Sequence, residues 1–168
     1  MKREIVMGTV LLLPLIAAAA DFQPLAVKPG LWEATMTSKV QLPDAMLANV
    51  PPERRAQMEA MMAGRGGQAT VVKSCLTKDS LSRPLNFNND ARKTCQYNLV
   101  AASSTKQEVD IQCTAKDGKS TVGKMTFEVL SPESGRATMQ MTQDGGTKMN
   151  LTINTRYLGP DCGDVKPR

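Results

Sequence analysis

Apolar and polar residues alternate along residues 95–157 with a period of two, which is typical of half-buried β-strands. The apolar positions in this region are Cys95, Tyr97, Leu99, Ala101, Val109, Ile111, Cys113, Met125, Phe127, Val129, Ala137, Met139, Met141, Met149, Leu151 and Ile153. Mostly polar residues lie between them, and turn-forming residues separate the runs. The pattern predicts five antiparallel strands that share one apolar face and one polar face.

The first predicted hairpin folds about Ser104, so that paired residue numbers sum to 208. Cys95 then faces Cys113, and the apolar residues that follow each cysteine also face one another. A slip of one residue would place these side chains on the opposite face. The dipeptide Asp117-Gly118 predicts a two-residue turn. That turn would place a lysine opposite an apolar residue, so we expect a bulge near Gly123 that restores the apolar face.

Two further turns complete the predicted meander. Folding about Glu133 pairs Phe127 with Met139 and Met125 with Met141. The turn at residues 144–146 then pairs Met141 with Met149. The methionines therefore gather on the apolar face.

An earlier part of the chain supplies additional strands. Pro29-Gly30 precedes a run in which every second residue faces the same side, namely Trp32, Ala34, Met36, Ser38, Val40 and Leu42, with serine as the polar exception. We interpret Trp32 as a core anchor, with ligand stacking as the alternative, and Glu33 as an exposed strand carboxylate rather than a catalytic acid. A further strand is expected from Ala69 to Cys75, followed by a short helical turn with Thr77 as its N-cap.

A helical insertion is predicted at about 44–64. Prolines 51 and 52 suit a helix start, and Gly64 suits its end. Met58, Met61 and Met62 form a stripe at helical spacing. This stripe has three interpretations: packing by flexible side chains, a mobile cover over an apolar ligand, or Cu(I) binding by soft thioethers.

Residues 1–20 have the pattern of a secretory signal peptide. A basic start and a short apolar run precede the segment Ala18-Ala19-Ala20, which predicts cleavage before Asp21. The apolar run is too short to span a membrane, and residues 21–168 are expected to form a single exported periplasmic domain without a transmembrane anchor. The net charge of +5 is mild and interspersed. Because basic residues interleaved with aromatic residues are missing, we expect no nucleic-acid partner.

The sequence lacks the residues that several kinds of catalytic and binding site require. The sequence contains no histidine, which excludes Ser-His-Asp and Cys-His catalysis and the usual zinc sites. The segment 64–67 is glycine-rich but lacks the lysine of a phosphate-binding loop. We therefore expect a protein that is not an enzyme and that carries no cofactor.

Four short motifs occur in an order that resembles a known family. They are Pro29-Gly30-Leu31-Trp32-Glu33, Cys75-Leu76-Thr77, the pair Cys95 and Cys113, and Leu158-Gly159-Pro160-Asp161-Cys162. Together they are similar to an exported proteobacterial family known only as a domain of unknown function, number 3617 of its series. Asp161 is one departure, because the family usually has the cysteine directly after Gly-Pro. The resemblance implies export and one domain, and it transfers no mechanism.

Four cysteines in an exported chain predict two disulfides. The hairpin register selects Cys95–Cys113 and leaves Cys75–Cys162. We therefore predict a mainly β (α+β) fold: a curled antiparallel meander or half-barrel with one amphipathic methionine-rich helix and two disulfides. Its apolar face must be buried by curling, by the helix, or by both.

Three functional hypotheses follow. The first is non-catalytic binding of an apolar or lipid-like molecule. The second is a structural or interaction module that binds an envelope protein, and the third is Cu(I) handling by the helix methionines. The residues expected to face a ligand are Trp32, Met36, Met58, Met61, Met62, Tyr97, Phe127, Met139 and Met141.

Overall fold

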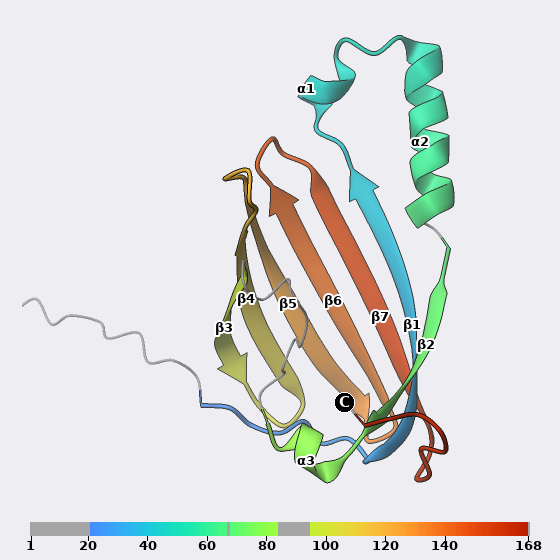
Figure 1. The fold of residues 1–168 in the computed structure, drawn as a ribbon, viewed down its shortest axis with the longest axis vertical. Helices are drawn as coiled ribbons and strands as arrows, with labels where there is room; N and C mark the ends of the chain where they lie inside the picture. Colours follow the sequence, from blue (N-terminus) through green and yellow to red (C-terminus); the bar gives the residue numbers. More distant parts are fainter. Residues whose placement is uncertain (1–20, 67, 84–94, 168) are drawn as a thin grey trace, which may run out of the picture.

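The computed structural model describes residues 21–66, 68–83 and 95–167 (Figure 1). Its centre is a seven-stranded antiparallel sheet with the order β2-β1-β7-β6-β5-β4-β3. The strands are β1 (Gly30–Gln41), β2 (Thr70–Leu76), β3 (Cys95–Ala102), β4 (Lys106–Thr114), β5 (Ser120–Ser131), β6 (Ser134–Gln143) and β7 (Lys148–Gly159). The predicted mainly β fold is confirmed, and β2 and β3 form the two edges. The predicted signal peptide lies outside the described residues.

The first hairpin has the predicted register from Cys95 to Leu99, but an unpredicted bulge then shifts the pairing, so that Ala101 lies opposite Glu108 instead of Gln107 and leaves the predicted apolar face. Cys95 pairs with Cys113, Tyr97 with Ile111, and Leu99 with Val109. The last hairpin is also as predicted, since Met141 pairs with Met149 and Ala137 with Ile153. In both hairpins the apolar residues meet on one face. A register shift of one residue would have moved the apolar residues of one strand to the opposite face.

The hairpin between β5 and β6 has a different register from the one predicted. Phe127 pairs with Ala137 and Met125 with Met139, two residues away from the expected partners. The turn is tighter than expected, because Ser131 and Ser134 already pair and only two residues lie between them. A shift of two residues keeps each side chain on its face, so the apolar face is preserved although the partners change.

The bulge predicted near Gly123 is also wrong. Strands β4 and β5 pair without a register shift, and Ile111 lies opposite Gly123. The additional residue lies in the turn instead, where the backbone N–H of Ala115 donates to the carbonyl of Lys119 and three residues remain outside the ladder. Gly118 has a positive φ of 82°, as the last residue of such a three-residue turn requires.

The insertion between β1 and β2 contains two helices. They are α1 (Asp44–Leu47) and α2 (Pro52–Gly66), which begin where predicted, although α2 continues through Gly64, the predicted helix end, to Gly66. Leu47 ends the first helix, and its carbonyl accepts a hydrogen bond from Nη2 of Arg55 at 2.6 Å. Figure 1 shows α2 beside the β1–β2 edge, beyond one end of β2, rather than across the sheet.

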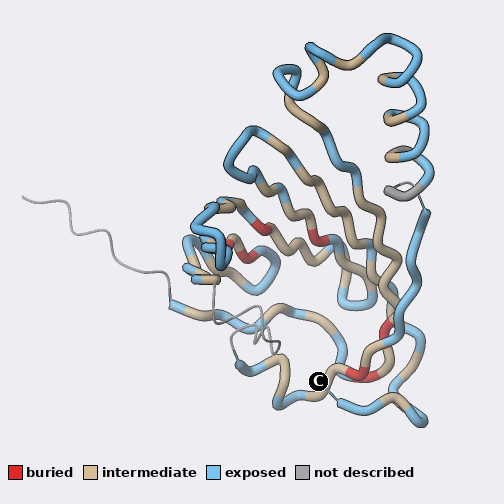
Figure 2. Tube along the Cα trace, turned by 45° about the horizontal axis from the view of Figure 1, so that its top comes forward, coloured by how far each residue is buried: buried red, intermediate tan, exposed pale blue. Residues whose placement is uncertain are grey.

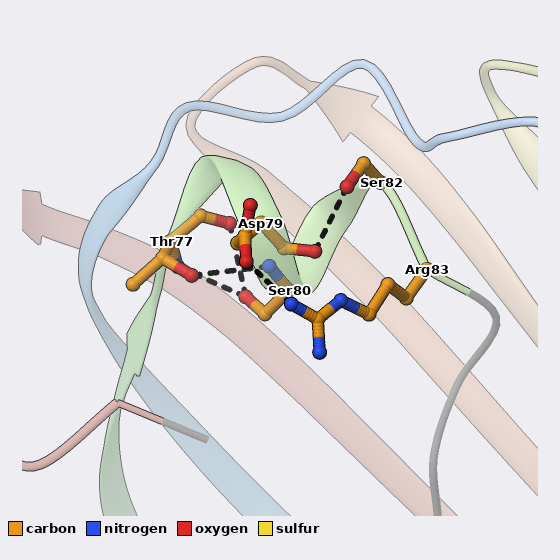
Figure 3. Close-up of polar contacts among 5 residues, drawn as sticks. All are labelled: Thr77, Asp79, Ser80, Ser82 and Arg83. Atoms are coloured by element: carbon orange, nitrogen blue, oxygen red, sulfur yellow. Dashed lines mark hydrogen bonds and ion pairs between the residues drawn. The ribbon is translucent and has the colours of Figure 1, made fainter.

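The predicted helical turn after β2 is α3 (Lys78–Leu81). The hydroxyl of its N-cap, Thr77, accepts from the backbone N–H of Ser80 at 3.0 Å, and the Ser80 hydroxyl oxygen accepts from the Thr77 N–H at 2.9 Å. Arg83 forms an ion pair with Asp79 one turn earlier (Figure 3). These contacts satisfy backbone groups that a helix start leaves without partners.

The two ends of the sheet differ. At the lower end in Figure 1, residues 21–29 run across the ends of the strands, and we call them the N-terminal strap. The strap is fixed by backbone hydrogen bonds from Ala26 to the Ser104 carbonyl and from Lys28 to the Pro132 carbonyl, at 2.7 and 2.9 Å. The upper end, near α1 and α2, carries no such crossing segment within the described residues.

Two disulfides connect parts of this framework. Cys95–Cys113 joins β3 to β4, and Cys75–Cys162 joins the end of β2 to the C-terminal tail. Both pairs are those predicted from the hairpin register. Asp161 is accommodated in the tail, where its Oδ1 accepts a hydrogen bond from the Gly163 N–H at 2.9 Å. Because disulfides form and persist in oxidising compartments, the fold is suited to such a compartment.

Candidate ligand-binding face

One side of the sheet, which we call the apolar face, carries apolar residues from all seven strands. Its members follow the registers given above and are Trp32, Ala34, Met36, Val40, Val72, Tyr97, Leu99, Val109, Ile111, Met125, Phe127, Val129, Ala137, Met139, Met141, Met149, Leu151, Ile153 and Tyr157. Polar residues on this face are uncharged, and Gln107 and Thr155 are examples. A face of this composition has no group that could neutralise a charged ligand.

The apolar face is only partly covered. Val109, Ile111 and Met125 form a buried cluster, with 4–7% of each residue exposed. Around them, Met139, Met141 and Leu151 are half-buried, and Val40 is 39% exposed. Figure 2 shows the same pattern, with a few buried positions amid strands of intermediate exposure. The sheet therefore presents apolar surface to solvent beyond the small buried cluster.

The N-terminal strap closes the lower end of this face. Gln107 projects from the apolar face and is only 2% exposed. Its Nε2 donates a hydrogen bond to the Gln23 carbonyl of the strap at 2.5 Å. A buried amide without that partner would be costly, so this contact holds the strap onto the sheet.

Trp32 and Tyr157 seal the same end. They lie on neighbouring strands, and their rings meet edge to face with centroids 5.6 Å apart. Trp32 is 3% exposed, and its Nε1 donates to the Lys28 carbonyl at 2.9 Å. Lys28 also forms an ion pair with Glu133, which raises the pKa of the lysine through a hydrogen bond and through charge attraction. Trp32 is therefore enclosed by the strap and is not on the open part of the face.

A pocket lies at the opposite end of the sheet. It has a volume of about 310 Å³ and lies where β1 leaves the sheet, beside the turn that begins β7. Its lining residues are Gln41, Leu42, Pro43, Asp44, Gly146 and Lys148. Both a carboxylate and an ammonium group are present, so the pocket is polar while the neighbouring face is not.

The helix methionines lie apart from the sheet methionines. Met61 is 55% exposed on α2, whereas Met58 and Met62 are half-buried. The main sheet contact of α2 is with β1, at the edge of the sheet. The structure therefore brings Met36, Tyr97, Phe127, Met139 and Met141 onto one face and leaves the three helix methionines beside its edge.

Glu33 lies on the opposite, polar face. It pairs with Arg156 across β1 and β7, and its Oε1 accepts a hydrogen bond from the arginine Nε at 2.8 Å. This bond, together with the carboxylate charge, raises the pKa of Arg156. The arrangement explains Glu33 as one partner of a surface ion pair.

Sequence reasoning missed the strap and its partner Gln107. The strap has no periodic pattern, and the apolar alternation gave no indication that the Gln107 amide would be buried or what would satisfy it. No group of three or more His, Cys, Asp or Glu residues that could hold a metal ion occurs in the described part of the chain. Likewise, no helix among the described residues is long and apolar enough to cross a membrane.

Comparisons with known proteins give a family but no activity. A redesigned β-barrel, 13% identical, is matched over 84% of this chain and 100% of its own, with a TM-score of 0.21. An uncharacterised protein of Pseudomonas putida, from the region 5′ of lpd-3, is 33% identical, and the match covers 68% of this chain and 90% of the relative. The family described as "Protein of unknown function (DUF3617)" matches residues 27–162, and the chain therefore belongs to that family.

Proposed function

We propose that this protein binds an apolar, lipid-like molecule on the apolar face, without catalysis, in the periplasm. The observation that carries the proposal is that the apolar face is extensive and only partly covered. Seven strands contribute apolar side chains, yet the residues around the Val109–Ile111–Met125 cluster are only partly buried. Because soluble proteins rarely expose large continuous apolar surfaces, such a face is typical of a binding site.

The chemistry of the face favours a flexible, uncharged ligand segment. Methionine has three rotatable bonds and adapts to irregular partners, and Met36, Met139, Met141 and Met149 are all only partly buried on this face. No charged side chain from the seven strands projects onto it. An acyl chain would gain from burial here, whereas a charged group would lose its hydration without compensation.

The ends of the face suggest an orientation. The strap, Trp32 and Tyr157 close one end, while the other end adjoins the polar pocket lined by Asp44 and Lys148. An amphiphilic molecule could therefore place its chain along the strands and its polar group near the pocket. The two disulfides are consistent with the oxidising periplasm, and the predicted signal peptide would direct the chain there.

The test compares two neighbouring substitutions on β7. Met149 belongs to the apolar face, and Asn150 points to the other face. We expect Met149→Glu to abolish the binding of a fluorescent fatty-acid probe, and Asn150→Glu to leave it unchanged. Thermal unfolding would verify that both variants fold. Equal probe binding by wild type and both folded variants would contradict the proposal.

The exposed edge of β2 favours a second candidate function, the binding of an envelope protein. Val71 is 55% exposed, and among the described residues the outer side of β2 has only one partner, an isolated bridge from Cys75 to Pro167 at its far end. Free strand edges can accept an additional strand from a partner. A photo-crosslinker at position 71 should then give a single reproducible adduct in the periplasm, and a crosslinker at exposed Gln112 should not. Absence of a position-specific adduct would exclude this edge as the interface.

A further inference from the structure

Four methionines occupy neighbouring positions on the apolar face. Met125 on β5 pairs directly with Met139 on β6, and Met141 on β6 pairs directly with Met149 on β7. Met139 and Met141 are two residues apart on one strand, so all four side chains project from the same face. Directly paired side chains start about 4.5–5.5 Å apart at Cβ, which flexible methionines can bridge.

Gly123 creates space between these side chains. Gly123 lies on β5, two residues before Met125, and is opposite Met141 of β6. A Cβ atom added at Gly123 would lie 2.8 Å from Cγ of Met141. The Met141 side chain therefore leans over the glycine toward β5, the strand that carries Met125. Three thioethers, from Met125, Met139 and Met141, share this part of the face.

We infer that these sheet methionines form a site for a soft monovalent metal ion, Cu(I) or Ag(I), with Met149 beside it as a further ligand. Thioether sulfur is a soft ligand suited to Cu(I). All four cysteines are in disulfides, and the chain has no histidine, so the methionines are the soft donors that it offers. The inference concerns metal binding alone and does not depend on the proposed apolar ligand.

The exposure of the cluster makes the site accessible. Met125 is buried, with 7% exposed, whereas Met139, Met141 and Met149 are only partly buried. An ion could therefore reach the sulfur atoms from solvent and then be held against the apolar face. A monovalent ion with neutral ligands also carries less charge into this uncharged surface than a divalent ion would.

The test measures Cu(I) affinity by competition with the chromogenic chelator bicinchoninate, in the absence of a thiol reductant so that the disulfides stay intact. Leucine replaces methionine with little change in volume, so the variants should fold. We expect Met139→Leu/Met141→Leu to lower the affinity at least about tenfold, the scale on which altered metal sites lose affinity. The control, Met58→Leu/Met61→Leu/Met62→Leu on α2, should retain the wild-type affinity. Loss in the helix variant alone, or equal affinity in all three proteins, would overturn the inference.

A second measurement does not require a variant. With ¹³C-labelled methionine methyl groups, Ag(I) should shift the signals of Met125, Met139, Met141 and Met149. The signals of Met58, Met61 and Met62 on α2 should not move. Shifts confined to the helix methionines, or no shift at any methionine, would overturn the assignment independently of stability.

Discussion

Gly30 lies directly against Gly159, so the two ends of the family resemblance meet in the structure. A Cβ atom added at Gly30 would lie 2.3 Å from the Gly159 carbonyl oxygen and 3.0 Å from Cα of Pro160. Gly30 also has a φ of +138°, which side-chain-bearing residues rarely adopt. The Pro-Gly-Leu-Trp-Glu and Leu-Gly-Pro-Asp-Cys segments therefore form one structural unit at the closed end of the sheet.

Replacing Gly30 with alanine should destabilise the protein strongly. The unfavourable φ alone costs about 1–3 kcal/mol, and the backbone clash adds to it. Gly64→Ala is the matched control, because nothing lies within 4 Å of its Cβ position on α2, and alanine there should stabilise by about 0.5–1 kcal/mol. Urea unfolding measures both free energies. Equal stability of Gly30→Ala and wild type would show that the close approach is not required.

The two disulfides should contribute unequally to stability. Cys95–Cys113 spans a sequence separation of 18 residues, and Cys75–Cys162 spans 87. On the chain-entropy estimate, losses of about 3 and 4.5 kcal/mol follow for Cys95→Ala/Cys113→Ala and Cys75→Ala/Cys162→Ala respectively. Urea unfolding of the two double variants gives the order. A larger loss for the short loop would mean that native packing, not loop entropy, sets the difference.

Gln107→Ala should loosen the N-terminal strap. The side chain is buried and its Nε2 bonds the Gln23 carbonyl, so its removal should cost about 0.5–1.5 kcal/mol. Amide hydrogen exchange should accelerate at Ala26, whose N–H donates to the Ser104 carbonyl. Gln112→Ala, an exposed change on the other face, should leave both the free energy of unfolding and the exchange rate at Ala26 unchanged. Unaltered exchange at Ala26 in Gln107→Ala would show that the strap is held independently of this amide.

Asp144 should contribute to the pH dependence of stability. Its carboxylate accepts hydrogen bonds from the Ser120 N–H and hydroxyl at 2.6 and 2.9 Å, which lower the Asp144 pKa below its ordinary value of 3.8. A lowered folded-state pKa stabilises the fold above the unfolded-state pKa, and the contribution is lost as the pH falls through the folded-state pKa. The affected window therefore lies below about pH 4.

The check is urea unfolding at pH 7 and at pH 3. Asp144→Asn should reduce the difference in stability between the two pH values, because the titrating group is gone. Ser120→Ala retains the backbone N–H donor and should reduce this pH-dependent difference in stability less. An unchanged difference in Asp144→Asn would show that this carboxylate does not link folding to protonation.

The apolar alternation allowed most of the sheet to be predicted. Cys95 opposite Cys113 followed from hairpin symmetry, and the second disulfide followed from the first. The errors were local: turn length decided that Met125 pairs with Met139, and the three-residue turn ending at Gly118 replaced the expected bulge. Alternation fixes the face of a residue, but the backbone geometry of a turn decides its partner.

The candidate site could be predicted only as a face. The period of two placed Phe127 and Met139 on the same side, and the structure agrees. The position of α2 was not predictable, because a methionine stripe at helical spacing does not indicate which surface it contacts. The position of the strap could not be predicted from the residue pattern either, since its contact with Gln107 joins residues 84 positions apart.

The most direct test of ligand binding is native mass spectrometry of the protein exported to a periplasm and purified without detergent. We expect a mass excess that disappears on denaturation and has the mass of a lipid-like molecule. Met149→Glu should lose that excess while Asn150→Glu keeps it. The bare polypeptide mass for wild type, less four hydrogens for the two disulfides, would contradict the central claim.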